Sequence, residues 1–316
     1  APPAVVSIFL GDELTAILKA VEADAPYSAA ERSQMRLGVD ALPHFQKDTT
    51  DRNRTSPFAF TGNKFEFRML GSSNSIACAN IMLNSAVASV LRRYADALEG
   101  AEDFDAALHS LIRSVISAHK RIIFNGNGYD AAWLQEAERR GLSDLRTTPD
   151  CMPRLLDRKN IDMLTSLGVY TEAELRSRYE IMLENYCKTV NIEALTMADM
   201  AKKDILPAVE AYASEIAKAA AAKRSLDPDC PCAYERGLVR RLSVLCDAIA
   251  ADTEALENAI MRLHDTSGVT AESCAIRDEL LPRMRELRAA ADEAESITAA
   301  KFWPYPSYRE LLYSVG

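Results

Sequence analysis

The sequence contains few of the residues that mark specialised protein classes. Among its 316 residues there are 12 Gly, 13 Pro and 4 His, and only 7% of the side chains are aromatic. So little Gly and Pro is typical of an ordinary globular protein. Hydrophobic residues make up 48% and charged residues 26%, which is the balance of a globular protein rather than of a disordered one. A chain of this length forms one large domain or two smaller ones.

The sequence also lacks a long apolar run and an excess of positive charge. No segment approaches the ~20 apolar residues that span a bilayer. The net charge is −9, so the surface as a whole repels nucleic acid and anionic membranes. The 7 Cys are an odd number and accompany no secretory signal pattern, which favours a reducing, cytoplasmic compartment. We therefore expect neither nucleic acid nor membrane as a partner.

Residues that commonly bind zinc or phosphate do not cluster in the sequence. The close cysteine pair Cys230-Pro231-Cys232 has no second pair and no nearby His to complete a tetrahedral zinc site. Asn125-Gly126-Asn127-Gly128 lacks the Lys-Ser/Thr of a P-loop and follows no strand, so it predicts a turn. The four His are far apart, and we expect each to be structural or exposed: His44, His109, His119 and His264.

Strand patterns occur only near the start of the chain. Val5–Leu10 is short and apolar and predicts a buried strand, and the residues from Gly11 to Val21 predict a helix. Ser56–Phe60 and Lys64–Met69 alternate in character and are separated by Thr61-Gly62-Asn63. This arrangement predicts a β-hairpin with a short loop.

Helical patterns dominate from Ser75 onward. Apolar stripes predict helices at 76–98 and 108–116, and a short helix over Ala131–Arg140 is predicted to end at Gly141. Three longer stripes have heptad-like spacing and short intervening loops, which predicts a three-helix antiparallel bundle. They lie at Ile205–Ile216, Leu238–Leu263 and Leu280–Ala291. The expected fold class is therefore α+β, mostly α.

The second strand of the predicted hairpin has one charged face. Lys64, Glu66 and Arg68 share that face, whereas Phe65 and Phe67 are expected to point the other way, into the core. Such a cluster suits a site that binds a polyphosphate, its divalent cation and a carboxylate substrate. By spacing alone it is more typical of a solvated hairpin face, where ion pairs contribute roughly 0.2–1 kcal/mol.

A family resemblance favours the functional interpretation. The segment from Arg52 to Arg68, RNRTSPFAFTGNKFEFR, and the polar loop Gly71–Ser75 after it resemble the Asn-Arg-Ser/Thr and Arg-x-Glu-x-Arg motifs of glutamine synthetases, and especially of their type III branch. The resemblance continues in FNGNGYDAAWLQEAERRGL, VNIEALTMADMAKKDILPA and SYRELLYSV. It therefore covers nearly the whole chain.

This resemblance implies an ATP-dependent ligase that uses Mg²⁺ or Mn²⁺ to join glutamate and ammonium through a γ-glutamyl phosphate. Carried over by position, Arg54 would contact the transferring phosphate and Lys64 would face ATP. Glu66 would bind the divalent metal, and Arg68 would hold the carboxylate end of glutamate. The complete protein would be a cytoplasmic homo-oligomer of hexameric rings, single or stacked into a dodecamer, with active sites between neighbouring subunits.

The chain departs from the family pattern in two ways. Ala59 stands where better-known branches have a phosphate-binding arginine. The other metal-binding glutamates, the metal-binding histidine and the Asn-Gly-x-Gly-Lys-His segment have no counterpart among these residues. Because Ala1-Pro2 resembles the Ala-Pro that follows the family's flap glutamate, we expect a fragment that is inactive alone, with its other ligands upstream.

The resemblance also implies three regions. Residues 1–142 would be the C-terminal part of the catalytic domain, including strands of its barrel and an insertion at about 11–51. Residues 143–300 would be a helical region that contains the bundle, and 301–316 would return to the catalytic domain. The aromatic run from Phe302 to Pro306, which its prolines keep from continuing the helix, is predicted to pack the C-terminus onto the body of the protein. Two alternatives remain open: a non-catalytic helical module for oligomerisation or partner binding, and a γ-glutamyl ligase for another amine.

Overall fold

The structure is a computed structural model that describes residues 5–27, 34–35, 45–46, 53–71 and 74–313. The chain divides into two compact units. The first consists of Ala1–Arg146 with Arg154–Leu175, and the second of Thr147–Pro153 with Arg176–Gly316. Within the described ranges, no helix combines the length and apolar character needed to cross a membrane.

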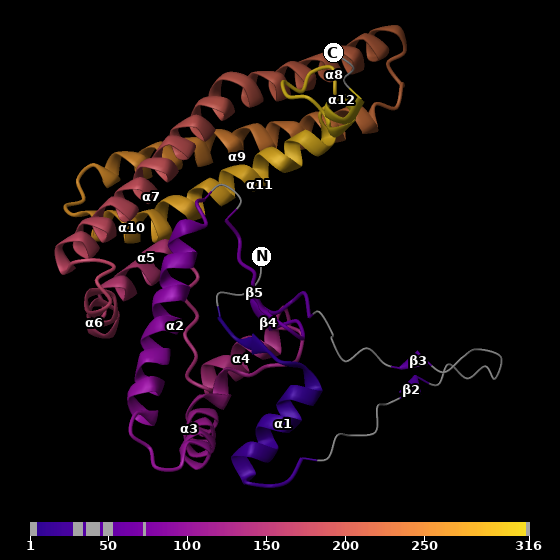
Figure 1. Ribbon diagram of the computed structural model, residues 1–316. Helices are drawn as coiled ribbons and strands as arrows, with labels where there is room; N and C mark the ends of the chain where they lie inside the picture. The colour runs from indigo at the N-terminus through magenta and orange to yellow at the C-terminus, as the bar shows by residue number, and fades with distance from the viewer. Residues whose placement is uncertain (1–4, 28–33, 36–44, 47–52, 72–73, 314–316) are drawn as a thin grey trace. The chain divides into compact units, whose positions relative to one another are not determined.

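The first unit contains a three-stranded sheet that includes the predicted hairpin (Figure 1). β1 (Ile8–Phe9) pairs in parallel with β4 (Phe58–Phe60), and β4 pairs antiparallel with β5 (Phe65–Phe67). The predicted strands are therefore confirmed, although they are shorter than expected. About half of the predicted insertion at 11–51 lies outside the described residues, and the described part contains α1 (Gly11–Ala23) and the paired strands β2 (Gln34–Met35) and β3 (Phe45–Gln46).

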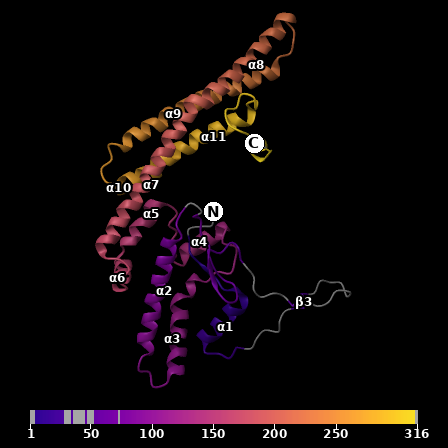
Figure 2. The same cartoon turned by 45° about the horizontal axis from the view of Figure 1, so that its top comes forward.

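Helices make up the rest of the first unit. α3 packs against α1 and α2, and α2 packs against α6 (Figure 2). α4 ends close to Gly141, as predicted, and Gly141 has the left-handed φ of 68° that commonly follows a helix. The helices are α2 (Ala77–Leu98), α3 (Phe104–His119), η1 (Lys120–Ile122), α4 (Ala131–Arg139), η2 (Met152–Leu156) and α6 (Arg158–Ser166).

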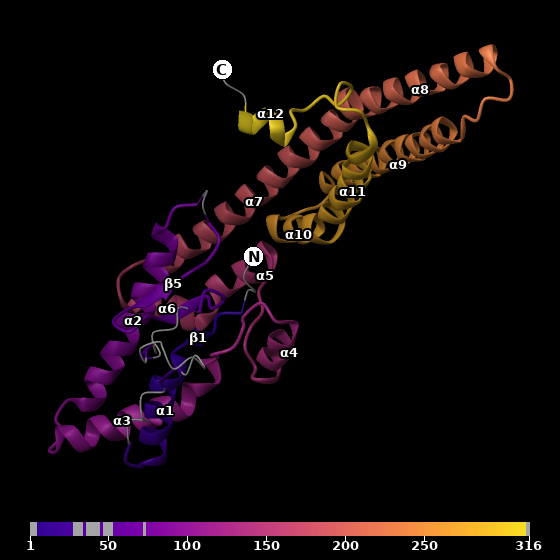
Figure 3. The same ribbon diagram turned by 90° about the vertical axis from the view of Figure 1, so that its right-hand side faces the viewer.

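The second unit is helical. α9 packs against both α8 and α11, and the three helices lie side by side (Figure 3). The mostly α, α+β class is thus confirmed. The helices are α5 (Thr148–Cys151), α7 (Glu172–Met200), η3 (Ala201–Ile205), α8 (Leu206–Leu226), α9 (Ala233–Leu263), α10 (Val269–Ala275), η4 (Ile276–Leu280), α11 (Leu281–Ile297) and α12 (Tyr308–Tyr313).

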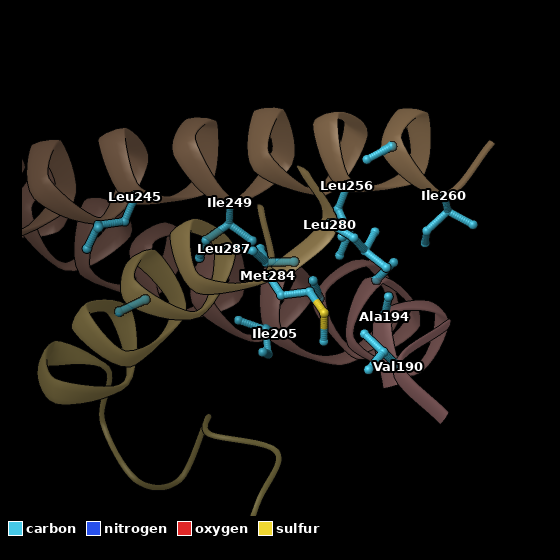
Figure 4. Packing of buried hydrophobic residues seen from close by; sticks show 14 of the residues in the cluster. Val190, Ala194, Ile205, Leu245, Ile249, Leu256, Ile260, Leu280, Met284 and Leu287 are labelled. Atoms are coloured by element: carbon cyan, nitrogen blue, oxygen red, sulfur yellow. The ribbon is translucent and has the colours of Figure 1, made fainter. Parts of the chain in front are cut away.

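Side chains from all three predicted stripes meet in one buried cluster (Figure 4). The stripe on α9 contributes Ile249 and Leu256, both with 0% exposure. α7 also contributes to this cluster, through Val190 and Ala194 among others, although no stripe in the sequence predicted this. The small residues on α7 explain the omission, because Ala and Cys make a weaker apolar stripe than Leu and Ile.

Two short π-helical segments, η3 and η4, interrupt the α-helices of this unit, each just before a proline. Each segment is five residues long and is followed by Leu-Pro, with the prolines at Pro207 and Pro282. Proline has no N–H and its ring clashes with the carbonyl four residues back, and a wider turn relieves that clash. The α7 and α8 segments therefore form one continuous helix through Pro207, which is longer than the stripe from Ile205 predicted.

The aromatic residues after α11 pack on the second unit. Trp303 and Tyr305 contact its core, and the ring of Phe302 lies 5.3 Å from that of Tyr212. The Tyr305 hydroxyl donates to Asp204 Oδ2 at 3.0 Å. Packing is thus the observed role of these side chains. The return of 301–316 to a catalytic domain, like the other predicted domain boundaries, stays a prediction.

Candidate functional site

The predicted charged face forms on β5 and its flanks. Arg68 Nη2 lies 2.8 Å from Glu66 Oε2, and Lys64 Nζ lies 3.5 Å from Glu66 Oε1. The hydrogen bond from Arg68, aided by the positive charges of Arg68 and Lys64, lowers the pKa of the Glu66 carboxyl. Glu66 is therefore a carboxylate at neutral pH, and the structure brings together three of the four predicted site residues.

Ala59 lies on the same face as Glu66, because the two residues pair across β4 and β5. Ala59 is completely buried. By this register, an arginine at position 59, which the resemblance leads us to expect in other branches, would lie on the charged face. In this chain a methyl group occupies that position, so the phosphate contact expected of such an arginine is not made from residue 59.

The prediction that Phe65 and Phe67 point into the core is wrong. Their exposed fractions are 50% and 37%. They do point away from Glu66, as strand alternation requires, but there they pack on Phe58 and Phe60 of β4 at ring distances of 5.2–6.0 Å. Alternation fixes only which face a side chain occupies, and a further layer is needed to bury that face.

Arg54 projects from a turn beside the sheet, defined here as the Asn53 turn (Asn53–Ser56). Ser56 N donates to Asn53 O at 3.3 Å, which closes the turn. The Asn53 side chain folds back so that its Oδ1 accepts from Thr55 N at 2.9 Å and from Thr55 Oγ1 at 2.6 Å. Such an Asx turn fixes the backbone and leaves Arg54 exposed. The preceding Arg52 lies outside the described residues.

Arg68 links the Asn53 turn to the charged face. Its Nη1 donates to Asn53 O at 2.7 Å, while its Nε and Nη2 donate to Glu66 Oε2 at 3.3 and 2.8 Å. A guanidinium has five N–H donors, so about two remain for a ligand carboxylate or phosphate. Arg54, the fourth predicted site residue, comes directly after Asn53, and the backbone carbonyl of Asn53 holds Arg68.

A second turn, defined here as the Phe124 turn (Phe124–Asp130), supports the Asn53 turn from 73 residues away. Asn53 Nδ2 donates to Gly126 O at 2.7 Å, and Gly128 N donates to Thr55 Oγ1 at 2.8 Å. The sequence indicated a turn here but gave no sign of these contacts. The Asn-Gly-Asn-Gly run is the only local signal, since it allows the backbone to approach another segment closely.

The described residues do not by themselves fit a divalent cation. They include no group of three or more His, Cys, Asp and Glu side chains placed to bind a metal. Glu66 is one carboxylate, and its Oε2 already accepts two hydrogen bonds from Arg68. A hard cation such as Mg²⁺ takes about six oxygen ligands. We therefore derive no chemical step through a metal from these residues.

In the part of the chain that the structure describes, cysteine and histidine add no further site. All seven cysteines are free. Burial raises the pKa of Cys187 to about 11, and burial also raises the pKa of Cys246. Thiols with raised pKa values are poor nucleophiles at neutral pH. Of the predicted structural or exposed histidines, His109, His119 and His264 are exposed, and His44 lies outside the described residues.

Comparison with known proteins connects the whole chain to one family. Residues 107–224 match the family described as the glutamine synthetase C-terminal domain. A glutamine synthetase from Butyrivibrio fibrisolvens is 40% identical over 100% of this chain and 45% of its own length. The type-3 glutamine synthetase of Dictyostelium discoideum is 33% identical over 99% of this chain and 44% of its own length.

A third relative, a glutamine synthetase from Bacteroides fragilis (strain YCH46), is 31% identical over 99% of the chain and 45% of its own length. The chain therefore spans less than half the length of the curated relatives it matches. The Asn53 turn and the hairpin lie before the matched C-terminal domain at 107–224 but within the range that the relatives cover.

Proposed function

Because the chain belongs to the glutamine synthetase family, we propose that it supplies one wall of the active site of an ATP-dependent glutamate–ammonia ligase. The observation that carries this proposal is the linked cluster of Lys64, Glu66, Arg68 and the Asn53 turn. Its support is that Arg68 is held by the backbone carbonyl of Asn53 as well as by Glu66.

In this proposal Arg54 and Arg68 bind anions. Arg54 is exposed at the corner of a rigid turn, from which its guanidinium can grip the phosphate that is transferred from ATP. Arg68 holds the carboxylate end of glutamate with the donors that Glu66 and Asn53 leave free. Positioning of this kind aligns the glutamate side-chain carboxyl with the phosphate and accounts for much of the rate of phosphoryl transfer.

Lys64 and Glu66 are proposed to act at the nucleotide. The Lys64 side chain is 66% exposed, so it can turn toward ATP without leaving a buried position. Glu66 is proposed as one ligand of Mg²⁺ or Mn²⁺, which supplies charge neutralisation when bound. The described residues include no group of three or more His, Cys, Asp and Glu side chains placed to bind a metal, and we propose that the remaining ligands come from the more than half of the relatives' length that this chain does not span.

The exposed apolar side chains of the first unit support the same proposal. Four large apolar side chains on β5, α2 and α3 are at least 40% exposed. They are Phe65, Val87, Leu91 and Ile112. Apolar surface of this kind marks a binding interface. We propose that the rest of the catalytic region packs here and completes the barrel, and that the chain alone does not synthesise glutamine.

The helical unit supports a second candidate role. One side of α7 is buried in the core, and apolar side chains also lie on the exposed part of this helix. Three of them are at least 50% exposed: Ile181, Ile192 and Leu195. We propose that α8, α9 and α11 form an antiparallel bundle and that α7 presents this second apolar side for assembly of rings. If the chain is non-catalytic, assembly or partner binding would be its whole function.

The test uses the complete protein that contains this chain. It should release phosphate from ATP only when glutamate and ammonium are both present, and Glu66→Ala should abolish this release. Glu138→Ala, an exposed carboxylate on α4, is the control that should retain activity. Unchanged turnover in Glu66→Ala would refute the role given to Glu66. Turnover with a primary amine but not with ammonium would favour the other-amine ligase, and no turnover with either would favour the assembly role.

A further inference from the structure

The Phe124 turn is a rigid platform rather than a free loop. The ring of Phe124 stacks on Trp133 with centroids 3.8 Å apart and planes 12° from parallel, and Trp133 is 2% exposed. Phe124 N also donates to Ile8 O at 2.9 Å, beside the sheet. An aromatic pair and a backbone bond thus fix where the turn begins.

Asn125 ties the same turn to the start of α1. Its Oδ1 accepts from Leu10 N at 3.1 Å and from Gly11 N at 3.2 Å, and its Nδ2 donates to Thr15 Oγ1 at 2.9 Å. No side chain of the α1 N-cap itself caps this helix. Asn125 therefore satisfies backbone donors that α1 leaves open, and α1 in return holds the Phe124 turn.

The Phe124 turn touches the Asn53 turn so closely that only glycine fits at the contact. Gly128 is buried, and a Cβ added there would lie 2.3 Å from Thr55 O and 3.2 Å from Thr55 C. The opposing atoms belong to the backbone and cannot rotate away as a side chain would. The absence of a side chain at residue 128 therefore sets the distance between the two turns.

The Thr55 hydroxyl joins the two turns. It donates to Asn53 Oδ1 at 2.6 Å and accepts from Gly128 N at 2.8 Å. Asn53 in turn offers its backbone carbonyl to Arg68 Nη1 at 2.7 Å. A chain of short hydrogen bonds thus runs from Gly128 through Thr55 and Asn53 to Arg68.

We propose that Thr55 and Gly128 are positioning residues, which act through the Asn53 turn to hold Arg54 and Arg68 where the phosphate and the glutamate carboxylate bind. This inference rests on the proposed function and extends it to a segment that touches none of the reactants. Loss of the Thr55 hydroxyl leaves Gly128 N without its partner and removes one of the two hydrogen bonds that Asn53 Oδ1 accepts. The turn then loosens while both arginines remain present.

The experiment compares three threonine variants in the complete protein. Thr55→Val keeps the shape but removes the hydroxyl, and Thr55→Ser keeps the hydroxyl. Thr165→Val removes a hydroxyl that donates to Ile161 O at 2.8 Å in α6, away from both turns, and serves as the matched control. We expect kcat/KM for glutamate to fall about tenfold or more in Thr55→Val, because small misplacements of positioning groups are costly. Thr55→Ser should stay within about threefold of the wild type, and Thr165→Val should be unchanged.

Hydrogen exchange of single amides gives a second readout that does not depend on activity. The amides of Gly128 and Ser56 should exchange faster in Thr55→Val than in the wild type and should remain protected in Thr55→Ser. Gly128→Ala should lower kcat/KM at least as much as Thr55→Val, since its Cβ displaces the Thr55 carbonyl.

Three results would overturn the proposal. Wild-type kinetics in Thr55→Val would do so, as would unchanged exchange at Gly128 and Ser56. The third is a loss of activity that is proportional to the loss of thermal stability, with the same proportion in all three threonine variants. Such a result would show that Thr55 has only a structural role. A wild-type protein without glutamate-dependent phosphate release would instead refute the proposed function, and the exchange data would still decide whether Thr55 orders the turn.

Discussion

Leu256→Ala should destabilise the helical unit strongly. Leu256 has 0% exposure and lies on α9 in the cluster that α7, α8 and α11 share (Figure 4). The change removes three carbon groups, which at about 0.8 kcal/mol each gives about 2.4 kcal/mol of lost burial. The cavity left behind adds to this loss, so the total is about 3–4 kcal/mol. A unit of this size should then melt about 6–16 °C lower.

Urea unfolding followed by far-ultraviolet circular dichroism measures this loss, because helices dominate the signal. Met261→Ala is the control: Met261 lies on the same helix but is 58% exposed, and its truncation should cost less than about 0.5 kcal/mol. If the two variants differ by less than about 1 kcal/mol, the buried face of α9 is not the core of this unit.

Two further predictions concern Arg68 and Tyr305. Arg68→Lys should raise the KM for glutamate about tenfold and leave the KM for ATP nearly unchanged. The reason is that one ammonium group cannot bond Asn53 O, Glu66 and a ligand together. Equal changes in the two KM values would contradict this role. Burial and the bond to Asp204 raise the pKa of Tyr305 from 10.0 to about 12. Its contribution to stability is therefore complete below pH 10 and is lost as the pH rises through about 12. Tyr305→Phe should lose less stability than the wild type between about pH 9 and about pH 11 in urea titrations, and equal losses would refute the assignment.

The sequence alone determined most of the local structure. Alternation on both sides of Thr61-Gly62-Asn63 predicted the hairpin, and the long Leu and Ile stripes predicted three of the core helices, α8, α9 and α11, but not α7. These signals are local: side-chain period and turn chemistry act within a few residues. The motif from Arg52 to Arg68 likewise identified the family, which the relatives confirm.

Only the tertiary structure decided which residues support the charged face. Nothing near Asn125 or Gly128 in sequence indicates that they hold the start of α1 and the Asn53 turn, because their partners are 73 to 115 residues away. The alternation of side chains along β5 likewise placed Phe65 on the face away from Glu66. It did not show whether another layer of the structure covers that face. The period of a strand or helix sets the direction of a side chain, whereas its partner depends on where the chain returns in space.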